Sequence, residues 1–324
     1  MLKLNDIWNT KNLIAYALLP ISYIYGVISK ISFTFIRPKK VSIPVISVGN
    51  LSVGGTGKTP ITRYIVKFFQ RNGLKTATIL RGYKGRITHT TKVDPSIHKA
   101  DDVGDEAILH SYDGDTWVST NRYLGAQEAI KYGAEIIILD DAHQNFSLKK
   151  DISLIVVDGT EMFGNEYLLP AGPLRENIKS GLNRADGIII CNESIDLHRE
   201  IGKSNKPIFY NKFIPEKNLK ELKDCEAYAF CGIANPRRFY KTLEEYGVQV
   251  VKKKTFGDHH KYKDNEINDI LRNSTRLGLV TITTEKDITK IKKKYRDEIS
   301  TLKIKVEWRN NQFIDFLINK ISIR

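Results

Sequence analysis

Apolar runs of strand length recur along the first two thirds of the chain, with helically spaced apolar residues between them. The strand-like runs cover residues 41–48, 77–80, 117–119, 136–139, 154–157 and 187–191. The helical patterns cover residues 60–71, 105–111, 122–132 and 179–184. This alternation predicts an α/β fold in which a parallel sheet carries helices on both faces.

A second alternation of the same kind occupies the last third of the chain. Strand-like runs at 227–231, 248–253 and 279–283 are separated by helical patterns at 236–246 and 264–273. Between the two alternations, residues 203–223 are polar and rich in lysine, which indicates a connector. A last helical pattern covers 311–321. We therefore predict a smaller α/β domain after the first one.

The N-terminal segment is apolar in a different way. Residues 12–29 carry no charge and lie between Lys11 and Lys30, and basic residues follow at 37, 39 and 40. This length is at the lower limit for a membrane span, and no small-residue cleavage site follows it. A membrane-associated helix lying in the interface is the favoured interpretation, since the basic residues suit an anionic leaflet. A full span and an ordinary buried helix remain alternatives.

Charge and cysteine content narrow the classes of partner. Lys and Arg number 51 against 37 Asp and Glu, a formal net charge of +14. Such a surplus favours polyanions, namely nucleic acid, an anionic membrane or a phosphorylated substrate. The three cysteines lack CxxC spacing, so we expect reduced, buried thiols rather than a disulfide framework or a zinc site.

The stretch SVGGTGKTP, residues 52–60, follows a strand-like run and precedes a helical pattern. This is the context of a phosphate loop, whose backbone N–H groups surround phosphate oxygens at a helix N-terminus. Ser52 replaces the first glycine of the usual pattern, and Val53 replaces the second lysine of dimerising partition-type ATPases. The expected ATP-binding residues are Ser52, Val53, Gly54, Gly55, Thr56, Gly57, Lys58 and Thr59. Lys58 would contact the β- and γ-phosphates, and the Thr59 hydroxyl would contact Mg²⁺.

With this loop placed, the chain divides into five predicted segments. They are an N-terminal membrane-associated helix at 1–36, a nucleotide-binding domain at 37–205, a connector at 206–225, a smaller α/β domain at 226–310 and a C-terminal helix at 311–324.

Two acidic groups are candidates for the chemistry. Asp140 and Asp141 end the run IIILDD and are expected at the sheet edge where a phosphate-loop protein orders Mg²⁺. Asp141 as a helix N-cap is the alternative. In DDVGDE, residues 101–106, Asp105 or Glu106 could accept the proton of an attacking hydroxyl, or the acids could simply cap a helix.

The sequence GDHHKY, residues 257–262, carries adjacent histidines beside Asp258. No third ligand at metal spacing accompanies them, so a surface or packing role is one interpretation. The other is that one of these histidines orients the acidic base or tunes its pKa.

Several blocks in order resemble the tetraacyldisaccharide 4'-kinase family of lipid A biosynthesis. Besides the phosphate loop they are LRGYKGR (80–86), VGDE (103–106), NRYLGA (121–126), LDDAHQ (139–144), PAGPLRE (170–176), FGDHHKY (256–262) and TTEKD (283–287). The resemblance implies transfer of the ATP γ-phosphate to the 4'-hydroxyl of lipid A disaccharide 1-phosphate, giving lipid IVA. It also implies a protein at the cytoplasmic face of a bacterial inner membrane, against an anionic lipid surface. We expect a monomer that binds no nucleic acid.

The resemblance also implies roles for residues. Asp105 would be the base, supported by His259, and Lys58 would act on the phosphates. Thr59, Glu106, Asp140 and Asp141 would hold Mg²⁺ and its water shell. The positions expected to contact the substrate are Tyr83, Arg122, Gln144 and Arg175, although Tyr83 and Arg122 could merely pack or pair. The family usually has DDGFQ where this chain has DDAHQ, which bears on the turn and on the packing of Gln144.

Two other classes of protein match parts of the sequence. A phosphate-loop switch or maturation ATPase would not need the apolar N-terminal helix, and Val53 argues against the dimerising members. A nucleic-acid-binding protein would account for the net charge, but the basic residues are spread along the chain and no nucleic-acid-binding module is recognisable.

Overall fold

The computed structural model describes residues 7–34, 36–192, 196–216 and 222–321. Parts of the predicted N-terminal helix (1–6 and 35), nucleotide-binding domain (193–195), connector (217–221) and C-terminal helix (322–324) lie outside the described residues. The chain forms two compact units. The first comprises residues 1–81, 119–213 and 306–324, and the second comprises residues 82–118 and 214–305.

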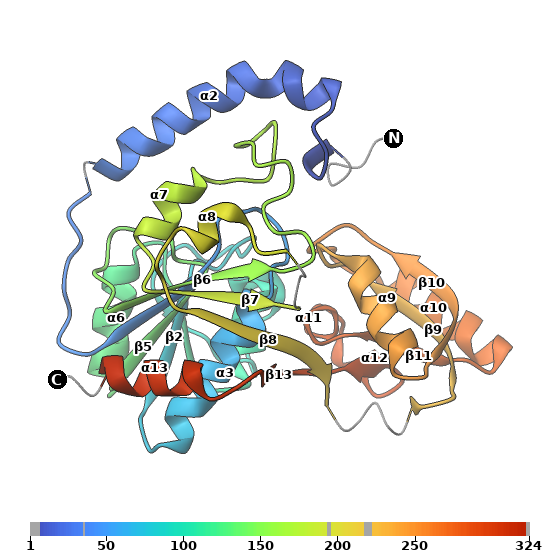
Figure 1. The fold of residues 1–324 in the computed structure, drawn as a ribbon. Coiled ribbons are helices and arrows are strands. Elements are labelled where there is room, and N and C mark those ends of the chain that lie inside the picture. The colour runs from blue at the N-terminus through green and yellow to red at the C-terminus, as the bar shows by residue number, and fades with distance from the viewer. Residues whose placement is uncertain (1–6, 35, 193–195, 217–221, 322–324) are drawn as a thin grey trace. The chain divides into compact units, whose positions relative to one another are not determined.

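A parallel sheet is the centre of the first unit (Figure 1). Within the described residues it belongs to the larger of two sheets, which has nine strands there. Its parallel part runs in the order β8-β7-β6-β1-β5-β2. These strands are β1 (Val45–Gly49), β2 (Thr76–Leu80), β5 (Ile136–Asp140), β6 (Ile152–Asp158), β7 (Gly187–Cys191) and β8 (Ile208–Pro215). The strand β13 (Ile304–Trp308) belongs to the same sheet. The predicted α/β class with a phosphate-loop sheet is confirmed.

Helices cover both faces of this sheet. On one face, α3 (Lys58–Arg71) and α13 (Gln312–Ile321) pack apolar side chains against alternate residues of the strands, such as Ile189. On the other face, α7 (Ile178–Asn183) and α8 (Arg199–Gly202) pack against the strand residues that point the opposite way, such as Ile188 and Ile190 of β7. Because both faces are buried, the strands are nearly continuous apolar runs. Helix α6 of this unit covers Arg122–Lys131.

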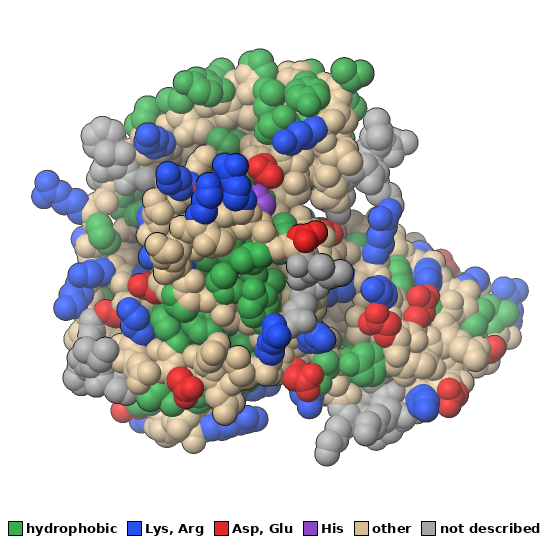
Figure 2. All heavy atoms as spheres, viewed as in Figure 1, with side chains coloured by type: hydrophobic (Ala, Val, Ile, Leu, Met, Phe, Trp, Pro, Cys, Tyr) green, Lys and Arg blue, Asp and Glu red, His purple; other side chains and the backbone are tan. Residues whose placement is uncertain are grey.

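The N-terminal helix α2 covers Leu13–Thr34 and lies outside the sheet layers (Figure 1). Its window Leu13–Ile31 is long and apolar enough to cross a membrane, and only 11% of it is buried. One side of the helix is attached to the first unit, since the buried Ser22 hydroxyl donates to the Leu168 carbonyl (2.9 Å) and accepts from the Ala171 amide (3.0 Å). Apolar side chains along the helix face outward (Figure 2).

The second unit is built around a four-stranded parallel sheet in the order β10-β9-β11-β12. Its strands are β9 (Glu226–Cys231), β10 (Gln249–Thr255), β11 (Val280–Thr284) and β12 (Ser300–Leu302). Its helices are α9 (Pro236–Glu245), α10 (Asp264–Leu277), α11 (Glu285–Ile288) and α12 (Lys293–Arg296). Helix α9 packs on one face of the sheet and α10 on the other.

Residues 82–118 form the earlier part of the second unit and lie in the sequence between two segments of the first unit. This segment contains β3 (Thr91–Lys92), α4 (Ala100–Val103), α5 (Asp105–Ser111) and β4 (Asp115–Val118), with β3 and β4 antiparallel. Sequence periodicity had placed residues 82–118 in the nucleotide-binding domain and 306–310 in the smaller domain. Tertiary contacts instead place residues 82–118 in the second unit and residues 306–310 in the first. The sequence pattern could not show this, because it is local and does not report contacts between distant segments.

The connector expected at 206–225 contains a strand, so this part of the prediction was wrong. Residues 208–215 form β8, which pairs with β7 in parallel. The strand itself is mostly apolar, with Phe209 buried in the core and its one lysine, Lys212, exposed. Lysines on either side of it, such as Lys203 and Lys206, make residues 203–223 polar on average, so composition over that window indicates a loop.

Phe209→Ala tests whether β8 belongs to the core. The Phe209 ring packs edge-on against Phe313 of α13 at a centroid distance of 5.2 Å. Its removal should lower the free energy of unfolding by about 3–5 kcal/mol, the usual cost of emptying a buried aromatic site. Urea unfolding measures this change. Lys212→Ala, on the same strand but exposed, should stay within about 0.5 kcal/mol, and equal losses in the two variants would exclude this description.

Candidate functional site

The loop Ser52–Thr56 lies between β1 and α3, as expected for a phosphate loop. Gly54 and Gly57 adopt positive φ values of 124° and 95°, a region that favours glycine. A Cβ atom at Gly57 would lie 2.5 Å from the Phe213 ring, so space as well as conformation requires glycine there. Lys58 and Thr59 then form the first turn of α3, where the N-terminal amides of a helix favour an anion.

The start of this loop is paired with the segment that carries Arg175. The Val53 amide donates to the Pro173 carbonyl, and the Arg175 amide donates to the Leu51 carbonyl, both at 2.8 Å. Ser52 and Leu174 form the antiparallel bridge between these two bonds. The PAGPLRE block is therefore joined to the phosphate loop by backbone hydrogen bonds, and Ser52 serves this pairing without needing to be glycine.

The two aspartates after β5 reach the same sheet edge as the phosphate loop. Val48 of β1 is in register with Asp140, which accepts a hydrogen bond from the Thr62 hydroxyl of α3 at 3.2 Å. Asp141 follows with a left-handed φ of 49°. Its carboxylate lies 3.7 Å from the Lys58 ammonium and accepts two bonds from one Arg175 nitrogen, at 2.9 and 3.1 Å.

Opposing effects act on the pKa of Asp141. Burial raises it, but the charges of Lys58 and Arg175 outweigh burial and leave the pKa below its ordinary value. The side chain is therefore an ionised carboxylate held by two cations. Asp141 is not a helix N-cap in this structure, because α6 has ended before it and no helix begins at it.

Two residues expected to contact the substrate, Arg122 and Gln144, are bonded to other parts of the protein. Arg122 is buried at the start of α6 and donates to the Ser119 carbonyl. Burial lowers its pKa to about 10, partly offset by the charge of Asp141. Gln144 donates to the Asn50 carbonyl at 2.7 Å and to the Glu176 carboxylate at 3.0 Å. Both side chains therefore use their polar groups within the protein.

His143, which replaces the usual Phe of the DDGFQ pattern, makes polar contacts in the core. His143 is buried, with Nε2 3.1 Å from the Gly181 carbonyl and Nδ1 3.2 Å from the Ser153 hydroxyl. Since a carbonyl can only accept, Nε2 carries the proton and the Ser153 hydroxyl donates to Nδ1. Burial, with the nearby Lys150 charge, lowers the pKa of His143 to about 3. Lys150 itself donates to the carbonyls of Ala142 and His143.

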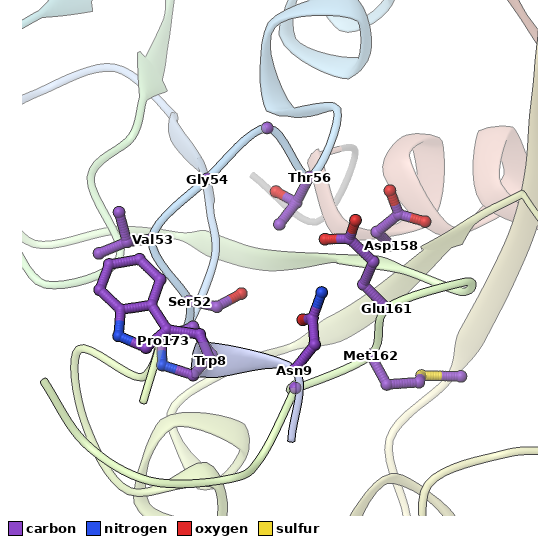
Figure 3. Close-up of a pocket in the computed structure, with 12 residues that line it drawn as sticks. Trp8, Asn9, Ser52, Val53, Gly54, Thr56, Asp158, Glu161, Met162 and Pro173 are labelled. Carbon is purple, nitrogen blue, oxygen red and sulfur yellow. The ribbon is translucent and has the colours of Figure 1, made fainter. Parts of the chain in front are cut away.

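A small polar cavity borders the phosphate loop (Figure 3). Ser52, Val53 and Thr56 line one side of it, and Asp158 and Glu161 line another. Trp8 lies across the opening near Pro173, and its indole N–H donates to the Pro170 carbonyl at 3.0 Å. The exposed side of the loop therefore faces a space with two carboxylates on its wall.

In the second unit, Asp105 and His259 form a close pair. Asp105 is the first residue of α5 and is 5% exposed, and both of its carboxylate oxygens lie close to His259 Nδ1, at 3.0 and 2.9 Å. His259 follows β10 in a left-handed conformation, with φ 58°. Burial alone would raise the pKa of Asp105. The hydrogen bond from His259 and the charge of Lys286 outweigh burial and lower the pKa.

The remaining members of this cluster surround the pair. Glu106 lies 3.3 Å from the Lys286 ammonium, and Lys290 lies 3.9 Å from Asp105. The exposed Tyr83 ring packs edge-on against the His259 ring at a centroid distance of 5.3 Å. The geometry is that of an ionised carboxylate with a fixed imidazole, which suits proton acceptance from a hydroxyl.

A family model described as Tetraacyldisaccharide-1-P 4'-kinase matches residues 14–322, nearly the whole chain. The chain belongs to this family.

Individual relatives with the same name also match most of this chain. The tetraacyldisaccharide 4'-kinase of Rhodospirillum rubrum is 34% identical over 322 residues, covering 98% of this chain and 97% of that protein. The enzyme of the same name from Parvibaculum lavamentivorans is 37% identical over 289 residues, covering 87% and 83%. A solved structure described as LpxK from Aquifex aeolicus in complex with ATP superposes with a TM-score of 0.79 at 28% identity, covering 95% of this chain and 99% of that one.

These findings confirm the predicted family, fold and activity. The chain is an ATP-binding kinase of lipid A biosynthesis, a tetraacyldisaccharide 4'-kinase. The predicted site residues divide between the units: those of the phosphate loop, the Asp pair, Arg122, Gln144 and Arg175 lie in the first, and Asp105, Glu106, His259 and Tyr83 lie in the second.

Sequence reasoning missed two residues of this 4'-kinase that contact the Asp105–His259 pair. Lys286 and Lys290 lie in and just after α11, and Asp287 between them is fully buried. The signal was present, because TTEKD was one of the blocks that resemble the family. It was not used, because a lysine beside an aspartate on a short helix has no characteristic chemistry until its neighbours are known.

His143→Phe, which restores the residue usual in the family, should change how stability depends on pH. The unfolded chain binds a proton at His143 near pH 6.5, whereas the folded chain does so only near pH 3. Between these values the unfolded state binds more protons, so the contribution of His143 to stability falls as the pH falls, by up to about 1.4 kcal/mol per pH unit. The variant should lack this component.

Urea unfolding of both proteins at pH 7, 6 and 5 measures the difference. The stability of the natural chain relative to His143→Phe should decrease steadily on acidification. Exposed His89→Phe is the matched control and should retain the slope of the natural chain. Parallel stability curves for the natural chain and His143→Phe would show that His143 is not held neutral.

Proposed function

We propose that this 4'-kinase transfers the γ-phosphate of ATP to the 4'-hydroxyl of tetraacyldisaccharide 1-phosphate, with Asp105 as the general base. The observation that carries the proposal is the buried Asp105 carboxylate, which accepts a hydrogen bond from His259 and lies near two ammonium groups. The acceptor hydroxyl would give its proton to Asp105 as its oxygen bonds to phosphorus and the bond to ADP breaks. ADP leaves with the electron pair of that bond.

The phosphate loop is the proposed ATP site. Its glycines leave the backbone N–H groups accessible, and Lys58 adds a positive charge beside them. The ATP complex of the Aquifex aeolicus relative supports this assignment. Lys58 and Arg175 are paired with Asp141 here, so both cations are already held at the edge where phosphates would bind.

The oxygen donors at the same edge fit Mg²⁺. Thr59, Asp140 and Asp141 supply hydroxyl and carboxylate oxygens, which this hard cation prefers. Glu106, in the second unit, stays a predicted ligand of the ion. Among the described residues no three His, Cys, Asp or Glu side chains form a group that could hold a metal. This suits Mg²⁺, which commonly binds one or two carboxylates together with substrate phosphates. When bound, the ion would neutralise charge on the transferred phosphoryl group.

The proposed substrate residues differ in accessibility. Tyr83 is 56% exposed and Arg175 is partly exposed, so both can contact a bound disaccharide or its phosphate directly. Arg122 is buried, and we assign it to the support of Asp140 and Asp141 through its charge. Gln144 holds the Asn50 carbonyl behind the loop, which we take as a positioning role.

The cytoplasmic face of the inner membrane is the proposed location. Helix α2 supplies an apolar surface in which Tyr23, Ile24 and Ile28 are 76%, 58% and 59% exposed. An exposed apolar surface of this extent favours a lipid interface over water. The acylated substrate is itself a membrane component, so association through α2 would bring enzyme and acceptor together.

Asp105→Asn tests the base. The amide keeps the shape of the side chain but cannot accept the proton, so kcat should fall by about 10²- to 10⁴-fold. ATP affinity, measured by calorimetry, should stay within about twofold, because the phosphate loop is unchanged. Product is followed as the bis-phosphorylated lipid in detergent.

Asp101→Asn is the matched control, since Asp101 lies in the same acidic block but is exposed and paired with Lys261. It should turn over normally. Normal turnover by Asp105→Asn would remove Asp105 from the base position. ATP hydrolysis by the natural chain without any phosphorylated lipid would instead contradict the proposed acceptor.

Tyr23→Glu combined with Ile28→Glu tests the membrane association without deleting contacts of α2. Both side chains face outward, so the fold should be retained while two charges enter the lipid-facing surface. Binding to vesicles of phosphatidylethanolamine and phosphatidylglycerol should weaken by about tenfold or more. The control variant combines Leu124→Glu, at an exposed position in α6, with Tyr132→Glu, at the exposed residue that follows α6. It carries the same added charge and should bind vesicles like the natural chain. Equal sedimentation of both variants would contradict the role of α2.

A further inference from the structure

The Lys286 ammonium is the centre of the cluster around Asp105 and His259. Its Nζ lies 3.3 Å from Glu106, 3.6 Å from Asp258 and 4.0 Å from Asp105. It is also 3.3 Å from Nε2 of His259. The side chain is only 20% exposed, and the surrounding carboxylates raise its pKa, so it remains an ammonium. This lysine belongs to the TTEKD block.

Hydrogen-bond chemistry fixes the proton on His259. An ammonium has donors and no acceptor, so Nε2 of His259 must be the acceptor in its contact with Lys286. A neutral imidazole with an accepting Nε2 carries its proton on Nδ1. That nitrogen faces both oxygens of Asp105 at 3.0 and 2.9 Å, which is the geometry for donation from Nδ1 to the carboxylate.

The other charged groups near the ring do not reverse this arrangement. Asp258 approaches Nε2 at 3.6 Å, too far for a hydrogen bond, and its other oxygen accepts from the His259 amide at 3.0 Å. Lys290 adds its charge on the Asp105 side, at 3.9 Å from the carboxylate.

The backbone around α11 holds Lys286 in place. Helix α11 begins at Thr284, whose hydroxyl accepts from the Asp287 amide at 3.0 Å. The fully buried Asp287 carboxylate accepts from the Gly232 amide at 3.0 Å and pairs with Lys290 at 2.6 Å. The Gly232 carbonyl in turn accepts from the His259 amide at 3.2 Å. One peptide segment therefore anchors both the helix of Lys286 and the loop of His259.

We propose that Lys286 is a positioning residue that holds His259 as the neutral Nδ1–H tautomer. In that state the imidazole can only donate to Asp105, and the carboxylate remains the group able to accept a proton. The tautomer follows from the contacts of the second unit alone, whereas its catalytic consequence rests on the proposed function of Asp105.

Nitrogen NMR of protein labelled with ¹⁵N-histidine tests the tautomer directly. The His259 signals are assigned by their loss in His259→Asn. The natural chain should show a protonated Nδ1 and an unprotonated Nε2. In Lys286→Met, Nε2 loses its donor, so the ring should shift to a tautomer mixture or become protonated. Lys286→Arg should keep the original pattern. Lys293→Met, an exposed lysine on the neighbouring helix, should leave it unchanged.

Kinetics test whether the effect passes through His259. Lys286→Met should lower kcat by about tenfold or more with the KM for ATP unchanged, and Lys286→Arg should recover most of the loss. Combined with His259→Ala, Lys286→Met should cause little further loss, because residues that act as one unit are not additive.

Three results would overturn the proposal: a protonated Nε2 in the natural chain, an unchanged His259 spectrum in Lys286→Met, or additive losses in the double variant. The first needs no variant, so it holds even if Lys286→Met does not fold. Normal turnover by Asp105→Asn would contradict the general base and leave the tautomer assignment intact, so the two failures can be told apart.

Discussion

The parallel pairing of β1 with β5 is the constraint on which the first unit depends. Because parallel strands end at the same edge of a sheet, the loop after β1 and the aspartates after β5 must lie together. The register of Val48 with Asp140 sets this juxtaposition to within one residue. Everything else at this edge, from the Thr62 hydroxyl to the Arg175 guanidinium, is arranged around carboxylates whose place the sheet has already fixed.

The clusters around Asp141 and Asp105 both keep a carboxylate ionised by placing cations beside it. A carboxylate that is largely withdrawn from water tends to become protonated, and each cluster opposes this with cations. Asp141 has Lys58 and Arg175, whereas Asp105 has Lys286 and Lys290 together with a hydrogen bond from His259. In both cases the pKa falls below its ordinary value despite burial. Each unit therefore holds an ionised carboxylate among cations.

Backbone strain marks both clusters as well. Asp141 and His259 adopt left-handed conformations, with φ values of 49° and 58°, that non-glycine residues seldom use. Such conformations persist where surrounding contacts determine them, and here the contacts are the ion pairs of Asp141 and the hydrogen bond from the His259 amide to the Gly232 carbonyl. The ring of His143, which stands where the family usually has Phe, has hydrogen-bond partners in the Gly181 carbonyl and the Ser153 hydroxyl.

Strongly apolar elements could be predicted from the chain alone. The runs at 136–139 and 187–191 became β5 and β7, and the pattern at 105–111 became α5, because burial on both faces of a sheet or a clear helical spacing leaves a local signal. β8 was missed because the lysines that flank it in residues 203–223 make that window polar on average, although the strand itself is mostly apolar. The assignment of 82–118 to the second unit could not be predicted either, since it depends on contacts between residues more than 100 positions apart, such as Asp105 with His259.

For the site, the sequence by itself determined the phosphate loop, the acidic pairs and the family, because glycine spacing and residue chemistry are local properties. Only the tertiary structure showed that Arg175 belongs to Asp141, that Arg122 is buried, and that Lys286 contacts His259. A lysine's role depends on which carboxylate or imidazole it meets, and that partner is chosen by the packing of distant segments. The proton on His259 is the clearest case, because it is set by a residue 27 positions away.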